Sequence, residues 1–172
     1  QAQIAKEYVK FNERSMIRLL GDMRAYNYVV IPTHDFDKVI YQIRAIDFDQ
    51  QSFEGKLMVY RPQFFKENYP MISVVKDKLS TDSIIQYKIE ERSILAKRIL
   101  SAGKRLNKLI KIMNMDQVSK PEHIDNLTKE LYKFTKDEAF KECFNMGGVM
   151  EASFSYVLRN YKNMNLSNLM NS

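Results

Sequence analysis

Acidic and amide side chains in the first 50 positions have the types and spacing for metal and proton chemistry. Asp22 follows Gly21 at the end of an amphipathic stretch, and Asn27 comes five positions later. A run rich in Val, Ile, Tyr and Phe then leads to Asp47 and Asp49. Carboxylate and amide oxygens suit Mg²⁺, which takes one or two carboxylates with water and phosphate completing its shell. A further carboxylate can receive or orient the proton of an attacking hydroxyl.

The order of these residues resembles the catalytic centre of protein-kinase-like phosphotransferases. In that superfamily a catalytic loop carries Asp, four residues and Asn, and the next hairpin ends in a metal-binding Asp. The Gly-Asp pair and the Ile-Asp-Phe-Asp ending at 46–49 are closer to aminoglycoside-phosphotransferase-like and other atypical kinases than to eukaryotic protein kinases. The match spans residues 20–49. It departs from the family pattern at Leu20 and Arg24, where such families often have His.

The resemblance implies a role for each matching residue. Asp22 would be the catalytic base, and Asn27 and Asp47 would be metal ligands. Asp49 would assist as a metal ligand if the strand continues past Asp47, because alternate residues of a strand share a face. Mg²⁺ and ATP are the implied cofactors, and a hydroxyl group is the implied phosphate acceptor. The alternative is structural, since an Asp in a turn after a helix is often a local backbone cap.

The superfamily's nucleotide-binding lobe, with its Gly-rich loop and phosphate-pairing Lys, would precede residue 1. The chain has five Gly and four Pro in 172 residues, too few to favour a Gly-rich phosphate loop. It also begins at Gln1, without Met, inside an expected helix. We therefore expect the C-terminal lobe of a longer kinase-like protein, whose partner is the missing N-terminal lobe. The isolated lobe is expected to be inactive because half of the nucleotide site is missing.

The elements that must position these residues follow from periodicity and turn chemistry. Apolar residues at helical spacing predict a helix over 2–19 that ends at Gly21. The stretches 26–31 and 38–48, with a turn-prone segment between them, predict a β-hairpin. Residues 50–80 lack sustained periodicity and are expected to be a loop region with short helical turns.

A helical bundle is predicted over residues 81–165. Apolar residues at alternating steps of four and three predict a long helix over 81–114, with Gly103 as the expected site of a bend. Capping-box signatures at 119–122 and 135–138 predict the starts of two further helices.

Gly147 and Gly148 predict a break before a last helix over about 149–162. The expected fold class is mostly α with a β-hairpin (α+β), as one domain over 1–172. Residues 1–49 would hold the catalytic loop and the metal-binding hairpin, and the helical bundle would follow. The resemblance implies that this architecture is a kinase-like C-terminal lobe.

The net charge of +6 lies in one segment. Residues 76–112 hold ten basic and four acidic side chains, and the helix 92–111 is basic without any acid. Four of its lysines fall on a broad face opposite the apolar stripe: Lys97, Lys104, Lys108 and Lys111. Such a face is either a solvated surface or a surface for phosphates or an acidic partner. The alternative function is therefore a non-catalytic binding or scaffold module, either a degenerate kinase lobe or an unrelated helical domain.

The composition also bears on nucleic-acid partners, membrane partners and the cellular compartment. No recognisable nucleic-acid motif accompanies the basic segment, which does not favour a nucleic-acid partner. No run of about 18 apolar residues exists, so we expect no membrane partner. Cys143 is the single cysteine and cannot form an internal disulfide, which favours a reducing, cytoplasmic setting.

Overall fold

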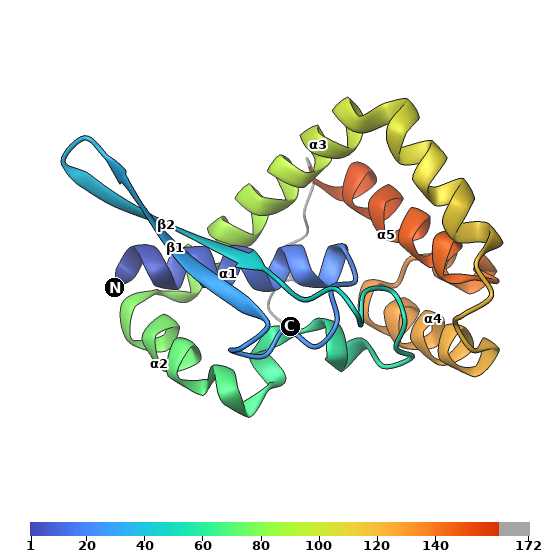
Figure 1. The fold of residues 1–172 in the computed structure, drawn as a ribbon, viewed down its shortest axis with the longest axis horizontal. Helices are drawn as coiled ribbons and strands as arrows, with labels where there is room; N and C mark the ends of the chain where they lie inside the picture. The colour runs from blue at the N-terminus through green and yellow to red at the C-terminus, as the bar shows by residue number, and fades with distance from the viewer. Residues whose placement is uncertain (162–172) are drawn as a thin grey trace.

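The computed structural model describes residues 1–161, and these residues are mostly helical with one two-stranded sheet, as the sequence predicts (Figure 1). The sheet is the hairpin β1–β2, and short 3₁₀ helices η1–η4 lie between the longer elements. In chain order the elements are α1 (Ala2–Ile17), β1 (Tyr28–Asp35), β2 (Lys38–Ala45), η1 (Leu57–Tyr60), η2 (Pro62–Phe64), η3 (Lys66–Asn68), α2 (Tyr69–Lys78), α3 (Thr81–Met115), α4 (Pro121–Thr135), η4 (Glu138–Glu142) and α5 (Met146–Asn160).

Helix α1 runs through the middle of the structure and contributes to two hydrophobic clusters (Figure 1). Tyr8 and Phe11 pack with the base of the hairpin, while Met16 and Ile17 pack with the helical bundle. The helix ends just before Leu19, whose φ of 50° is left-handed and incompatible with a continuing right-handed helix. The loop that leaves α1 therefore starts between the two clusters.

The hairpin is longer in its first strand and shorter in its second than the sequence predicts. The strands pair from Tyr28 and Ala45 at the base to Asp35 and Lys38 at the tip, so the turn is two residues long. Only the base is buried, and the outer half projects away from the helices (Figure 1). Strand β2 ends at Ala45 rather than at 48, which places Asp47 in the segment after the strand.

The prediction of a loop region over 50–80 is confirmed for η1, η2 and η3 and is wrong for α2. Pro70 suggests a loop in the sequence, but it lies in the first turn of α2, where its missing N–H removes no helical hydrogen bond. The apolar side chains of Met71, Ile72 and Val75 then pack against the α1–hairpin cluster.

The long helix and its bend are confirmed. Helix α3 spans residues 81–115, and Gly103 has non-helical angles, φ 33° and ψ −111°, inside it. A Cβ at this position would meet no atom within 4 Å, so the glycine is required by its backbone conformation and not by space. Figure 1 shows α3 rising to this bend and descending beyond it toward α4. None of the helices over 1–161 combines the length and apolar character needed to cross a bilayer.

Both capping-box predictions are wrong in detail. Helix α4 starts where predicted, but the Ser119 hydroxyl donates to the Ser52 carbonyl oxygen at 3.4 Å and caps nothing. The Thr135 hydroxyl bonds a carbonyl one turn earlier in α4, and Asp137 is the residue that caps η4. Neither hydroxyl accepts a hydrogen bond from an N–H of the helix that follows; the Thr135 oxygen accepts instead from the Asp137 N–H, before η4, at 3.2 Å.

The predicted break at Gly147 and Gly148 is also wrong, because both lie inside α5. The Asn145 side chain caps this helix by accepting from the Gly148 N–H at 2.7 Å. A Cβ at Gly147 would lie 2.2 Å from Asn114 Oδ1, so this glycine allows close packing of α5 against the end of α3. The part of the predicted bundle from 162 to 165 lies outside the described residues.

Candidate functional site

The loop between α1 and β1 is fixed by backbone contacts to a later part of the chain. The Asp22 N–H donates to the Val59 carbonyl at 3.0 Å, and the Ser52 N–H donates to the Leu19 carbonyl at 2.9 Å. Gly21 lies directly against Gln50, where a Cβ would be 2.3 Å from the main-chain oxygen. The missing side chain at Gly21 therefore lets the segment after the hairpin approach Asp22.

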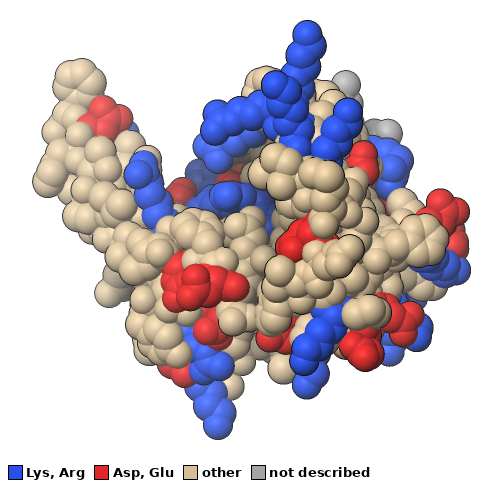
Figure 2. All heavy atoms as spheres, turned by 45° about the vertical axis from the view of Figure 1, so that its right-hand side comes forward, with Lys and Arg blue, Asp and Glu red and all other residues tan. Residues whose placement is uncertain are grey.

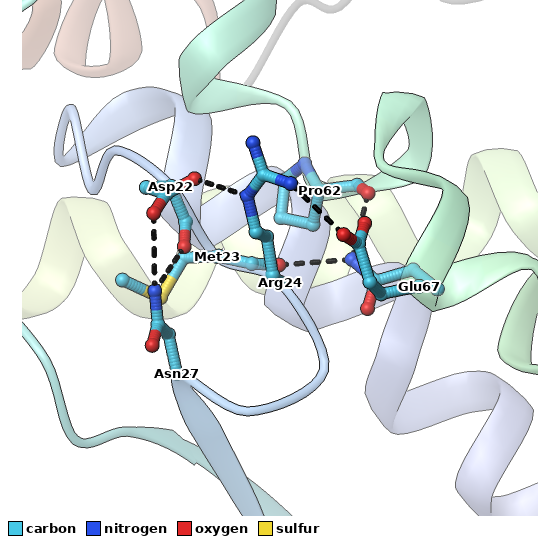
Figure 3. Close-up of polar contacts among 7 residues, drawn as sticks. Asp22, Met23, Arg24, Asn27, Pro62 and Glu67 are labelled. Carbon is cyan, nitrogen blue, oxygen red and sulfur yellow. Dashed lines mark hydrogen bonds and ion pairs between the residues drawn. The ribbon is translucent and has the colours of Figure 1, made fainter.

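Asn27 is buried and bound to Asp22. Its Nδ2 donates to the Asp22 carbonyl at 2.7 Å and to Asp22 Oδ2 at 3.3 Å (Figure 3). Both amide protons are directed at Asp22, so the Asn27 Oδ1 is left as an available oxygen ligand, and Figure 3 shows it pointing away from Asp22. Asp22 itself has φ 55°, an unusual conformation for a residue other than glycine and one that often occurs at functional sites.

Asp47 lies two residues after the end of β2, in the segment that follows the hairpin. The Ile46 N–H donates to the Asn27 carbonyl at 3.0 Å, which continues the hairpin pairing by one bond beyond Tyr28 and Ala45. No hydrogen bond joins the Asp47 side chain to Asp22 or Asn27 in residues 1–161. The structure thus brings Asp22 and Asn27 into direct contact, while Asp47 is linked to Asn27 only through the backbone hydrogen bond of its neighbour Ile46.

The premise for Asp49 as a ligand is wrong, because the chain turns after Asp47 and does not continue as a strand. The Asp49 N–H donates back to Asp47 Oδ1 at 3.0 Å, a local turn in which the two side chains no longer share a strand face. Asp49 is exposed and Asp47 is partly buried. The turn occupies one oxygen of Asp47 and holds the carboxylate in place.

No group of three or more His, Cys, Asp and Glu side chains that could hold a metal occurs in the described part of the chain. A metal at this site would therefore rely on one carboxylate, that of Asp47, and on the amide oxygen of Asn27. This donor set fits Mg²⁺, which keeps several waters and is commonly held by one or two carboxylates together with substrate phosphates.

Arg24 belongs to the site, although the sequence marks it only as a departure from the family pattern. Its Nε donates to Asp22 Oδ1 at 2.6 Å, and one of its terminal nitrogens donates to Glu67 Oε1 at 2.9 Å (Figure 3). The guanidinium lies over the Phe65 ring, 4.8 Å from its centroid. Hydrogen bonds to Asp22 and then to Glu67 raise the pKa of Arg24. Arg24 therefore places a permanent positive charge beside Asp22.

Asn68 is a second residue that the sequence did not single out. Its side chain is fully buried, and its Nδ2 donates to the carbonyls of Met23 and Pro62, both at 2.8 Å. Its Oδ1 accepts from the Tyr28 hydroxyl at 2.9 Å. One amide thus joins the Asp22 loop, the 3₁₀ segment and the start of β1. Its sequence neighbours, Asn-Tyr-Pro, indicate only a turn or helix start.

The four lysines predicted as a partner surface are exposed, as expected for either interpretation of the basic helix. None of them forms an ion pair with another described residue. The bend at Gly103 divides them, so that Lys97 lies on the first arm of α3 and the other three on the second arm: Lys104, Lys108 and Lys111. The predicted single face is therefore two surfaces.

Comparison of the chain with protein-family models, with curated proteins and with solved structures returns no match.

Proposed function

We propose that the chain is the C-terminal lobe of an atypical kinase-like phosphotransferase that uses ATP and Mg²⁺ and transfers phosphate to a hydroxyl acceptor. The supporting observation is the contact of Asn27 with Asp22, which directs both amide protons at the Asp22 loop and leaves the amide oxygen free. Asp47 directly follows Ile46, whose N–H donates to the Asn27 carbonyl. The proposal includes a nucleotide-binding lobe, supplied by a longer polypeptide, that completes the site.

Each residue has a role that its contacts support. Asp22 would orient the acceptor hydroxyl and receive its proton through Oδ2, which Arg24 does not bind and which accepts a bond of 3.3 Å from Asn27. Bound Mg²⁺ would neutralise charge on the nucleotide phosphates, with Asn27 and Asp47 as its protein ligands. The remaining amino group of Arg24 points away from both acids in Figure 3 and is available to the transferred phosphoryl group.

The metal role can be tested on this chain alone. Mn²⁺ replaces Mg²⁺ at such oxygen sites and broadens the NMR signals of nearby amides. We expect signals of Asn27 and Asp47 to broaden first on titration, and Asp47→Asn to abolish this effect. Asp37→Asn, in the exposed hairpin turn, removes the same charge and should leave the broadening unchanged. Broadening that is equal in the two variants would contradict the metal role.

The catalytic roles are tested in the polypeptide that includes the nucleotide-binding lobe. Asp47→Asn should lose Mg·ATP affinity, because it removes the only carboxylate ligand. Asp22→Asn should keep Mg·ATP binding and lower turnover by about 10²-fold or more, the usual contribution of a general base. Turnover and Mg·ATP binding equal to the parent in both variants would overturn the proposal. The acceptor is expected to bind over the 3₁₀ segment 57–68, next to Asp22.

A second candidate function, a non-catalytic module that binds an acidic partner, is favoured by the second arm of α3. Leu109, Ile112 and Met115 are 53%, 61% and 73% exposed beside the lysines of that arm. We expect reversal of Lys104, Lys108 and Lys111 to Glu to abolish binding of an acidic or phosphate-bearing partner. Reversal of Lys129 and Lys133, on α4, is the matched control. Unchanged binding in the first variant would exclude this surface.

A further inference from the structure

A cleft of about 520 Å³ lies between α1, β2 and the first arm of α3, away from the contacts of the candidate site. None of Asp22, Asn27 and Asp47 lines this cleft. Figure 2 shows the hollow between the projecting hairpin and the helices, with Lys and Arg side chains gathered inside it. The residues that matter here are Arg14, Arg18, Leu20, Phe48, Glu91 and Arg98.

Basic side chains outnumber acidic ones in the cleft by five to two. The acids are Glu7 and Glu91, and the basic residues are Lys10, Arg14, Arg18, Arg44 and Arg98. Glu91 is already used, because Arg14 binds its Oε1 at 2.7 Å. Glu7 lies eleven residues before Arg18 on α1, which is about 16 Å along the helix axis. Among the described residues, neither acid therefore forms an ion pair with Arg18 or Arg98 at the inner end of the cleft.

Of the four other basic residues in the cleft, two have a side-chain partner and two have none among the described residues. Lys10 pairs with Glu90 at 3.0 Å, outside the cleft, and Arg44 donates to the Gln42 side chain at 2.9 Å. The guanidiniums of Arg18 and Arg98 have neither a hydrogen bond nor an ion pair to any residue from 1 to 161. Two unpaired guanidiniums thus line one cleft.

The surroundings of Arg18 within residues 1–161 leave its positive charge without a balancing negative charge. The residue caps the end of α1 and is partly buried against the cleft wall. Burial, together with the nearby charges of Arg14 and Arg98, lowers the pKa of Arg18, and Glu91 opposes this effect. A charge removed from water is costly unless it is paired, and this guanidinium faces two like charges. An anion between Arg18 and Arg98 would offset both the loss of hydration at Arg18 and the repulsion between the guanidiniums.

The rest of the cleft wall is apolar. Leu20 and Ile43 are buried parts of the α1–hairpin cluster, while the Phe48 ring is 48% exposed at the cleft. Ile94 contributes from α3. A ligand that fits the cleft therefore has an anionic group for the guanidiniums and an apolar body that covers Phe48.

We propose that this cleft binds a small phosphate monoester with an aromatic or aliphatic body, its phosphate between Arg18 and Arg98. A phosphate monoester carries a charge of about −1.5 to −2 at neutral pH, which balances two guanidiniums. Its oxygens also match the planar fork of donors that Arg presents. A carboxylate supplies half of this charge and should bind more weakly. This inference does not depend on the proposed phosphotransferase function.

Binding is measured by NMR titration of the chain with phenyl phosphate, inorganic phosphate, benzoate and benzyl alcohol. We expect phenyl phosphate to bind best and to shift the side-chain Nε–H signals of Arg18 and Arg98. Arg18→Gln and Arg98→Gln should each weaken phenyl phosphate about tenfold, since each removes a charge-assisted contact. Arg105→Gln, an exposed residue beyond the bend of α3, is the matched control and should bind like the parent.

A further variant tests the contribution of the apolar body of the ligand separately from that of its phosphate. Phe48→Ala should weaken phenyl phosphate but leave the weaker inorganic phosphate unchanged. Arg98 is exposed and Arg18 unpaired, so both Gln variants should fold, and Arg18→Gln should unfold at the same or higher urea concentration without ligand. Equal affinity in Arg18→Gln, Arg98→Gln and Arg105→Gln would overturn the proposal. Loss of phenyl phosphate binding in Asp47→Asn alone would also overturn it, by placing the ligand at the candidate site.

Discussion

Asn68 is the residue on which the geometry of the candidate site most depends. It supplies two donors and one acceptor to three separate segments, and all of these contacts are buried. The contact between Asp22 and Asn27 is local, because the two residues lie five positions apart, and it could be predicted from their spacing. The contact of Arg24 with Glu67 joins residues 43 positions apart. No local pattern signals the pairing of Arg24 with Glu67 or the contacts of Asn68, so the sequence did not predict them.

The role of Asn68 leads to a prediction about stability. In Asn68→Asp, a carboxylate oxygen replaces the Nδ2 that donates to the carbonyls of Met23 and Pro62, so one negatively charged acceptor faces two carbonyl acceptors. We expect the free energy of unfolding in urea to fall by about 3 kcal/mol or more, since a buried group is left unsatisfied. Tyr28→Phe removes only the third hydrogen bond and should cost about 1 kcal/mol. Similar losses in the two variants would contradict the central role of Asn68.

At the scale of elements, periodicity predicted most of the fold, and capping signals predicted little of it. The helices α1, α3 and α4 and the hairpin lie within a few residues of their predicted positions. Helix α2 was missed because ten residues with Pro70 in the first turn show little periodicity. The predicted caps failed because Ser119 and Thr135 bond carbonyls of other turns. Hydroxyl partners are chosen by tertiary contacts, which a local motif does not contain.

The bend of α3 at Gly103 can be tested by substitution. Its φ of 33° with ψ −111° is a conformation that residues with a Cβ rarely adopt, although space for a side chain exists. We expect Gly103→Ala to lower the free energy of unfolding by about 1–2 kcal/mol, because the backbone strain exceeds the gain in helix propensity. Asn107→Ala, an exposed position on the second arm, should change it by less than about 0.5 kcal/mol. A more stable Gly103→Ala variant would mean that α3 straightens in solution.

At the scale of the whole molecule, α1 is the element that both the candidate site and the cleft share. Its end leads into the Asp22 loop, and one side lines the cleft. The Ser153 hydroxyl of α5 donates to the carbonyl of Ile17 at 2.8 Å, which fixes the end of α1 to the bundle. Ion pairs then join α1 to α3, among them Arg14 with Glu91 and the buried pair of Glu13 with Arg92. The position of α1 therefore sets the geometry of both sites.

The buried pair of Glu13 with Arg92 gives a prediction for the molecule as a unit. Both side chains are almost completely buried, at 5% and 6% exposure. Glu13→Leu removes the carboxylate that the buried Arg92 guanidinium binds, and we expect a loss of about 3–5 kcal/mol in the free energy of unfolding. Glu13→Leu combined with Arg92→Leu removes both charges and should recover much of that loss, because an apolar pair needs no counter-charge. Lys6→Leu, which breaks a half-exposed pair with Glu90, is the control and should cost less than about 1 kcal/mol.

The same variants show whether the α1–α3 contact holds both sites together. If it does, Glu13→Leu should weaken phenyl phosphate in the cleft and Mn²⁺ near Asn27 in parallel. The double variant should restore both, because it brings α1 back against α3 without restoring the charges. Urea unfolding and the two NMR titrations measure this on one set of samples. A double variant as unstable as Glu13→Leu would instead mean that the buried charges themselves are required.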